Sequence, residues 1–116
     1  MQFQTVFAGT PVADHAAAQA WYERLLGRPA DRRPMDGLAE WDLTAGGGIQ
    51  VSIDAERAGT TVLTLSVDDL DGYAATLKGR GITVGTIETG VVSRFAAVTD
   101  PDGNTIMLAE LLDTID

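Results

Sequence analysis

The sequence of 116 residues contains no cysteine, one histidine and no apolar run near the roughly 20 residues that span a bilayer. Without cysteine, disulfide bonds, thiol catalysis and cysteine-ligated metal are excluded. Basic residues are also scarce: Lys and Arg total 8 against 17 Asp and Glu, for a formal net charge of −9. Such a surface repels phosphate backbones and anionic lipid, so we expect neither nucleic acid nor a membrane as a partner. The acidity either keeps the protein soluble or attracts a cationic small molecule.

What the sequence does contain is typical of one globular domain. Hydrophobic residues make up 45% of the chain and charged residues 22%, which is enough apolar material for a core. The length suits a single domain over residues 1–116 rather than two large ones. The opening residues, Met1 to Gln4, lack the basic start of a secretory signal, so we expect a cytoplasmic protein.

The first half, about residues 1–55, predicts one helix and four strands. Asp14 is a good N-cap and Gly27 a good residue to close a helix, which bounds that helix to His15–Leu26. Apolar and acidic residues then alternate, with Trp41 on one side of a strand and Glu40 on the other. The strands expected here are Gln4–Thr10, ended by Pro11, a short edge strand within residues 28–37, Leu38–Thr44 and Ile49–Ile53.

The second half, about residues 60–112, repeats this order. Val12-Ala13-Asp14 recurs as Val67-Asp68-Asp69, an offset of 67 − 12 = 55 positions, with Asp69 as the cap of a second helix. Each half is too small to bury its own sheet, so we expect the halves to share a core. The strands expected here are Thr60–Val67, Ile82–Ile87, Val91–Thr99 and Thr105–Leu111, with turns at Glu88-Thr89-Gly90 and Asp100–Gly103.

These motifs resemble the vicinal oxygen chelate superfamily, which includes glyoxalase I, bleomycin-resistance proteins and extradiol dioxygenases. The likeness covers nearly the whole chain and rests on four segments: Val12-Ala13-Asp14, Trp21 to Gly27, Ser66 to Leu70, and Asp100-Pro101-Asp102-Gly103-Asn104. It implies an α+β fold of two βαβββ modules, which form an incomplete, cup-shaped mixed β-barrel with the helices outside. It also implies a homodimer, the common assembly of the family.

The resemblance further implies where a metal would be bound. Enzymes of this superfamily usually hold a divalent metal through His and Glu side chains on four strands. The corresponding positions here are Phe7, Val62 and Met107, with Gln50 as the fourth. Phe and Val have no lone pair, Met offers a soft thioether and Gln a weak neutral donor. We therefore expect no metal and no other cofactor, and the sole histidine, His15, lies outside this set.

What remains is a cup with an apolar floor, which suits a small organic ligand. Strand alternation adds Ser52 and Thr64 to its lining, Trp41 is a candidate aromatic wall, and Arg94 is a candidate partner for an anionic group. Each has a plainer interpretation: the apolar residues fill the core, the tryptophan lies in the core or an interface, and the arginine lies on the surface. The predicted ligand-binding residues are Phe7, Trp41, Gln50, Ser52, Val62, Thr64, Arg94 and Met107, and no catalytic residue is assigned.

Three functions follow from this pattern, in descending order of support. The first is a metal-free small-molecule binding protein of the glyoxalase/bleomycin-resistance type, which sequesters an antibiotic or a metabolite. The second is an enzyme of this superfamily, a lyase, isomerase or oxidoreductase, that acts without the usual metal; its candidate polar groups are Gln50, Arg94 and, where they face inward, Glu40 and Asp42. The third is an association module whose cup is filled.

Overall fold

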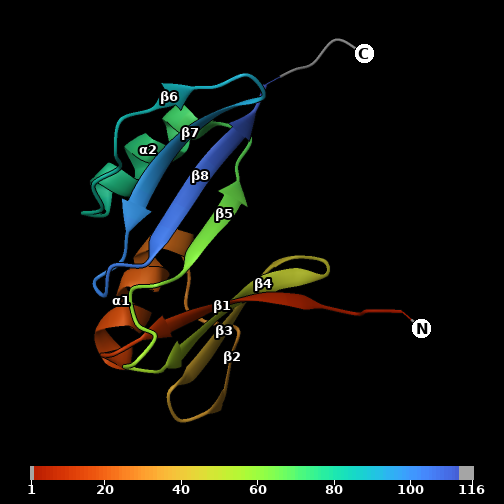
Figure 1. Ribbon diagram of the computed structural model, residues 1–116, viewed down its shortest axis with the longest axis vertical. Helices are drawn as coiled ribbons and strands as arrows, with labels where there is room; N and C mark the ends of the chain where they lie inside the picture. The colour runs from red at the N-terminus through yellow and green to blue at the C-terminus, as the bar shows by residue number, and fades with distance from the viewer. Residues whose placement is uncertain (1, 113–116) are drawn as a thin grey trace.

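Two four-stranded sheets and two helices make up residues 2–112, the part of the chain that the computed structural model describes (Figure 1). Neither of these helices is long and apolar enough to cross a membrane. In chain order the elements are β1 (Val6–Val12), α1 (His15–Leu26), β2 (Arg32–Met35), β3 (Leu38–Thr44), β4 (Gly47–Ile53), β5 (Val62–Ser66), α2 (Leu70–Gly79), β6 (Glu88–Thr89), β7 (Ser93–Thr99) and β8 (Thr105–Leu111).

The two sheets have the same topology. Their strand orders are β1-β4-β3-β2 and β5-β8-β7-β6. In each sheet the first strand pairs in parallel with the last strand of its half, and the other pairs are antiparallel. This confirms the predicted α+β fold of two βαβββ units. The strands of one sheet do not pair with those of the other, so the described chain forms two open sheets rather than one closed barrel.

Both helices begin as predicted, at equivalent positions of the repeat. The carboxylate of Asp14 accepts a hydrogen bond from the backbone N–H of Ala17 at 3.1 Å, and that of Asp69 accepts one from Gly72 at 3.0 Å. Each cap satisfies an N–H that has no partner within its helix. Gly27 ends α1 with φ of 81°, a left-handed conformation that glycine adopts without a steric penalty.

The two halves share one core. The buried face of α1 consists of Ala18, Trp21, Tyr22 and Leu25, and it packs in the same cluster as Leu70 and Leu77 of α2. Buried polar groups add to this junction. The Asn104 side chain donates to the carbonyl of Pro11 at 2.8 Å and accepts from the N–H of Thr61 at 3.0 Å.

Two predicted strands differ from the structure. Pro11 does not end the first strand but lies within β1, opposite Ser52. Its carbonyl accepts from Asn104, outside the sheet, so the proline occupies an edge position where no ladder N–H is needed. Residues 82–87 are not a strand. The apolar residues there are explained by burial, since Ile82 is only 4% exposed. The segment is joined to β7 by one backbone hydrogen bond, which the N–H of Gly85 donates to the carbonyl of Ala97. The expected turn at residues 88–90 instead contributes the two-residue strand β6.

Candidate ligand-binding site

Each sheet has one face packed on the helices and one face that points away from them, which we call its open face. On the first sheet the open face carries a row of paired residues that crosses all four strands: Gly9, Gln50, Glu40 and Arg32. Residues paired across neighbouring strands point to the same side, so these side chains lie together. The adjacent row contains Phe7, opposite Gly48. The structure therefore brings together Phe7 and Gln50 of the predicted set.

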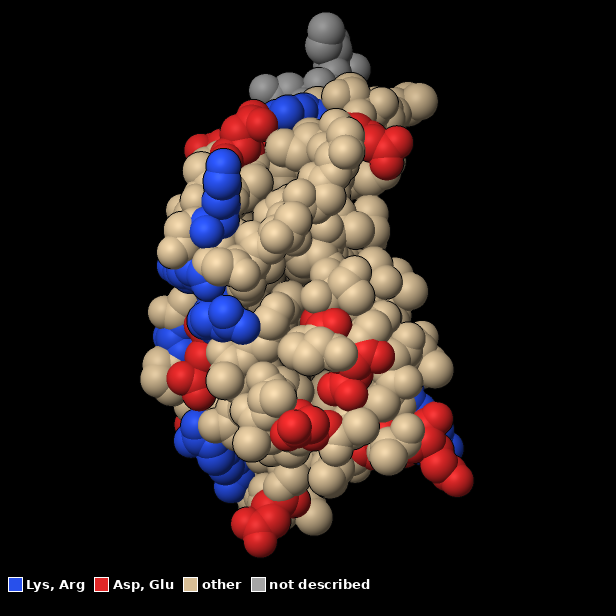
Figure 2. Space-filling view, turned by 90° about the vertical axis from the view of Figure 1, so that its left-hand side faces the viewer, with Lys and Arg blue, Asp and Glu red and all other residues tan. Residues whose placement is uncertain are grey.

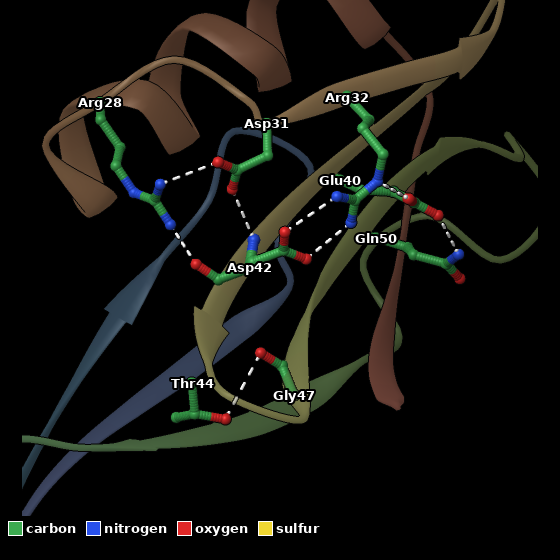
Figure 3. A network of polar contacts seen from close by, with 8 residues as sticks. All are labelled: Arg28, Asp31, Arg32, Glu40, Asp42, Thr44, Gly47 and Gln50. Carbon is green, nitrogen blue, oxygen red and sulfur yellow. Dashed lines mark hydrogen bonds and ion pairs between the residues drawn. The ribbon is translucent and has the colours of Figure 1, made fainter. Parts of the chain in front are cut away.

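A polar network occupies the centre of this face (Figure 3). Arg32 contacts two carboxylates: its Nε donates to Oε1 of Glu40 at 3.0 Å, and its two terminal nitrogens donate to Asp42 at 2.8 and 2.6 Å. The amide of Gln50 donates to the other oxygen of Glu40 at 2.6 Å. Glu40 is only 8% exposed, and both of its oxygens have partners, as a buried carboxylate requires.

These contacts fix the charge of the network. A hydrogen bond from Gln50, and a second from Arg32, hold the pKa of Glu40 below its usual value. The hydrogen bonds from Arg32 likewise lower the pKa of Asp42, and the two carboxylates raise the pKa of Arg32. At neutral pH the network thus consists of two carboxylates and one guanidinium. It carries an excess of negative charge, and its carboxylates are weak bases.

A hollow of about 390 Å³ lies beside this network. The aromatic ring of Phe7 forms one wall, and the guanidinium carbon of Arg32 lies 6.0 Å from the centre of that ring. The distance is at the limit for a cation–π contact. The hollow therefore offers an aromatic surface next to carboxylates. Its lining residues are Thr5, Phe7, Arg32, Glu40, Asp42, Thr44, Ala45 and Gly47.

The second sheet brings together the other predicted aliphatic and hydroxyl residues. Thr64 of β5 pairs with Met107 of β8, and Val62 lies two residues before Thr64 on the same face. Val62 is 69% exposed, and Met107 is half-buried. No hydrogen bond or ion pair within residues 2–112 joins this group to the Phe7 group on the first sheet. Ser52 shares the open face of the first sheet, since it pairs with Pro11, two residues after Gly9.

Trp41 and Arg94 do not lie on the open faces. Trp41 is fully buried on the helix side of the first sheet, where its ring centre is 6.2 Å from that of Tyr22 and its indole N–H donates to the carbonyl of Arg28. Arg94 lies on the side of α2 and forms an ion pair with Asp71 at 2.8 Å. Packing under α1 and pairing with α2, rather than contact with a ligand, account for these two residues, so we remove both from the candidate site.

A second hollow, of about 490 Å³, lies where the edges of the two sheets approach one another. Its walls are aliphatic side chains from the helix sides of both sheets, with Thr64 at its border. It is the main alternative location for an apolar ligand. Its apolar lining residues include Val6, Ala8, Leu26, Leu43, Ile49, Leu63, Leu65, Val67 and Tyr73.

The four residues that the resemblance assigns to metal-binding positions do not have the chemistry of ligands for a divalent cation. Phe7, Val62 and Met107 supply no carboxylate or imidazole, and the amide of Gln50 is committed to Glu40. Within residues 2–112, no three His, Asp or Glu side chains are grouped so that they hold a metal. The donor set therefore does not match a divalent cation.

The residue that sequence reasoning missed is Arg32. It was expected only within a proline-containing loop with a short edge strand, and nothing in its neighbours along the chain connects it to Glu40. The register of β2 on β3 makes that connection, because Arg32 is paired directly with Glu40. The alternation of β3 did predict that Glu40 and Asp42 share a face opposite Trp41, and this is confirmed.

Comparisons with known proteins agree with this architecture. The family model of the Glyoxalase/Bleomycin resistance protein/Dioxygenase superfamily matches residues 5–108. A solved glyoxalase/bleomycin resistance protein from Catenulispora acidiphila DSM 44928 is 35% identical, with a TM-score of 0.87 over 93% of this chain and 98% of that one. A comparison with curated proteins found no match.

Two further structures are similar in fold. TnmS3, an antibiotic binding protein from Streptomyces sp. CB03234, is 24% identical, with a TM-score of 0.78 over 97% of each chain. A bleomycin-binding protein complexed with bleomycin is 23% identical, with a TM-score of 0.75 over 93% of this chain and 98% of that one.

Proposed function

The chain belongs to the Glyoxalase/Bleomycin resistance protein/Dioxygenase superfamily, and we propose that it is a metal-free cytoplasmic protein that sequesters a small organic molecule. The observation that carries this proposal is the open face of the first sheet. There the aromatic ring of Phe7, at a position that the resemblance assigns to a metal ligand, lies beside a hollow and a satisfied polar network. Antibiotic-binding and bleomycin-binding proteins of the same fold support sequestration.

The charge of the site favours a cationic, partly aromatic ligand. Glu40 and Asp42 together outweigh Arg32, and the whole chain has a net charge of −9. A cation approaching Phe7 therefore meets both a ring face and an excess of carboxylate. An antibiotic or metabolite with a basic group and a planar ring system has the matching chemistry.

A second copy of the chain completes the site in this proposal. Val62 and Leu111 lie at opposite ends of the open face of the second sheet and are 69% and 68% exposed, so large aliphatic side chains are exposed at both ends of this face. A homodimer that covers the open faces would bury them and add a second wall to the hollow. Molar mass measured by light scattering tests this: we expect a dimer, and Val62→Asp should shift it toward the monomer. A wild-type monomer at micromolar concentration contradicts the dimer.

Ligand binding is tested by thermal-shift screening and calorimetry with bleomycin and a panel of cationic aromatic antibiotics. A ligand at a hundredfold excess over its Kd should stabilise the native state by about 2.7 kcal/mol. Phe7→Ala should weaken binding about tenfold or more, because it removes the aromatic wall. Phe3→Ala is the matched control, since Phe3 is 88% exposed outside the sheets, and it should leave affinity unchanged.

The same experiment identifies the location of the ligand. If Leu65→Ala abolishes binding while Phe7→Ala does not, the ligand occupies the hollow between the sheet edges and the open-face site is wrong. If no compound of the panel stabilises the protein, sequestration of this ligand class is wrong.

The alternative, an enzyme that acts without metal, has weaker support. Glu40 and Asp42 do lie on the open face, but their hydrogen bonds lower their pKa values, which makes them poor general bases near neutral pH. Turnover of a bound compound in the presence of a chelator, lost in Glu40→Gln, would favour the enzyme.

A further inference from the structure

The C-terminal ends of both helices meet on the side of the molecule away from the open faces. Arg24, in the last turn of α1, and Arg80, the residue that follows α2, each reach across to the end of the other helix. Nη1 of Arg80 donates to the carbonyl of Arg24 at 3.0 Å, and Nη1 of Arg24 lies 3.5 Å from the carbonyl of Arg80. Two guanidinium groups are thereby held at one place.

A cleft of about 730 Å³ opens at this junction, and it is basic in an acidic protein. Three of the eight basic residues of the chain line it, namely Arg24, Arg28 and Arg80, against a single carboxylate, Glu23. Figure 2, which views the molecule from the side on which the helices lie in Figure 1, shows basic side chains gathered along one edge of this face. Arg33 lies 3.8 Å from Glu23 and offsets part of its charge.

The two central guanidinium groups lack acidic partners. Within residues 2–112, no carboxylate forms an ion pair with Arg24 or Arg80, whereas Arg28 pairs with Asp31. A guanidinium has five N–H donors, and the contacts between the helix ends use one on each residue. Apart from the part of Arg80 that faces the Tyr73 hydroxyl, the remaining donors are available to a ligand. Each arginine also lies on one carbonyl at the end of the other helix, which offsets part of the negative potential there.

We propose that this cleft is an anion-binding site that takes a phosphate group, either free or carried by a small metabolite. The planar guanidinium group of arginine can donate two parallel hydrogen bonds to a pair of phosphate oxygens. A phosphate presents several acceptor oxygens to the two unpaired guanidinium groups of Arg24 and Arg80, whereas a carboxylate presents two. The site is separate from the open faces and of opposite charge, so it recognises a different molecule from the cationic ligand proposed above.

The test is calorimetric titration with inorganic phosphate, pyrophosphate and adenosine diphosphate at low ionic strength. All three should bind, and added NaCl should weaken binding. Equal affinity for pyrophosphate and the nucleotide identifies the phosphate group alone as the ligand; tighter binding of the nucleotide identifies a phosphorylated metabolite. Absence of binding by all three at millimolar concentration overturns the proposal.

Two variants and their controls locate the binding. Ala20→Glu places a carboxylate in the cleft wall without removing an arginine, so it should weaken phosphate binding by repulsion between like charges. Arg80→Gln removes one guanidinium and should weaken binding by about tenfold, as expected for the loss of a charge-assisted hydrogen bond. Ala55→Glu and Arg57→Gln make the same charge changes in the exposed loop before β5 and should leave affinity unchanged.

The controls separate a specific site from general charge effects. If the loop variants weaken binding as much as the cleft variants, or if binding persists in both cleft variants, the cleft is not the site. Thermal unfolding of each variant checks that the helix ends remain intact. Ala20→Glu keeps the proposal testable even if Arg80→Gln destabilises α2.

Discussion

The hydroxyl of Tyr22 donates a 2.8 Å hydrogen bond to Oδ2 of Asp100, a residue 78 positions further along the chain, and both side chains are buried. Oδ1 of the same carboxylate accepts the backbone N–H groups of Asp102 and Asn104, both at 2.9 Å. Burial, followed by the hydrogen bond to Asp100, raises the pKa of Tyr22 far above its usual value. The hydroxyl thus remains a neutral donor that ties α1 of the first half to the turn before β8.

We predict that Tyr22→Phe lowers the free energy of unfolding by about 2 kcal/mol, because it removes a buried hydrogen bond to a charged group. Tyr73→Phe is the matched control. Its hydroxyl donates to a neutral carbonyl, that of Leu25, from a half-buried position, and should cost about 1 kcal/mol or less. Urea unfolding measures both. Equal effects of the two substitutions would contradict a special role of the Tyr22 bond.

Trp41 should affect stability rather than ligand affinity. Trp41→Phe shrinks a fully buried side chain and removes the donor to the Arg28 carbonyl, so it should lower the free energy of unfolding by about 2 kcal/mol. Affinity for an open-face ligand should be unchanged at a temperature where the variant is folded. Arg94→Gln should also leave affinity unchanged, since Arg94 faces α2. A large loss of affinity in either variant would return that residue to the site.

Two glycines on the first sheet should respond differently to the same substitution. A Cβ at Gly48 would overlap the backbone carbonyl oxygen of Trp41, whereas a Cβ at Gly9 meets nothing within 4 Å. Gly48→Ala should therefore destabilise the protein by about 1 to 3 kcal/mol, as overpacking does. Gly9→Ala should be neutral or slightly stabilising, because alanine loses less chain entropy on folding. The midpoint of thermal unfolding distinguishes them, and equal midpoints would show that β4 relaxes freely.

Acid should destabilise the polar network. The pKa of Glu40 is lower in the folded protein than its usual value, so its contribution to stability is complete above that usual value, near pH 4.5, and is lost as the pH falls through the lowered pKa. Asp42 behaves in the same way, since its pKa is also lowered in the folded protein. The free energy of unfolding, measured from pH 6 downward through the range in which carboxyl groups titrate, should fall less in Glu40→Gln than in the wild type. An equal fall of this free energy with pH in both proteins would contradict the assignment.

Much of the fold could be predicted because its signals are local. The Asp14 cap, the Gly27 terminus and the offset repeat at Asp69 depend on residues within a few positions of each other, and all are present in the structure. The exceptions depend on where a segment lies in the tertiary structure. Pro11 was predicted to end a strand, but its effect depends on whether the strand lies at an edge, which the sequence does not state. The strand predicted at residues 82–87 was wrong, because Ile82 is buried although this segment is not paired as a strand in the sheet.

The candidate site was predicted less completely, because cross-strand neighbours are not neighbours in the chain. Phe7 and Gln50 could be assigned to one face by alternation and by the family resemblance. Trp41 could not be assigned to a face, since its own alternation fits either side, and the packing of Tyr22 decides it. Arg94 pairs with Asp71 of α2, and Arg32 contacts its carboxylates because of the register of the edge strand β2. Neither contact can be inferred from neighbours in the sequence.

By itself, the sequence determined both capped helices, most of the strands and the repeat, since each is a property of residue type and short-range spacing. It also determined which residue types stand at the four positions that the resemblance assigns to metal ligands. Only the tertiary structure decided that Arg32 forms ion pairs with the two carboxylates of β3, and that the arginines at the helix ends line one cleft. The physical reason is that hydrogen bonds, ion pairs and burial depend on distances in space. For residues far apart in the chain, those distances are set by sheet register and helix packing.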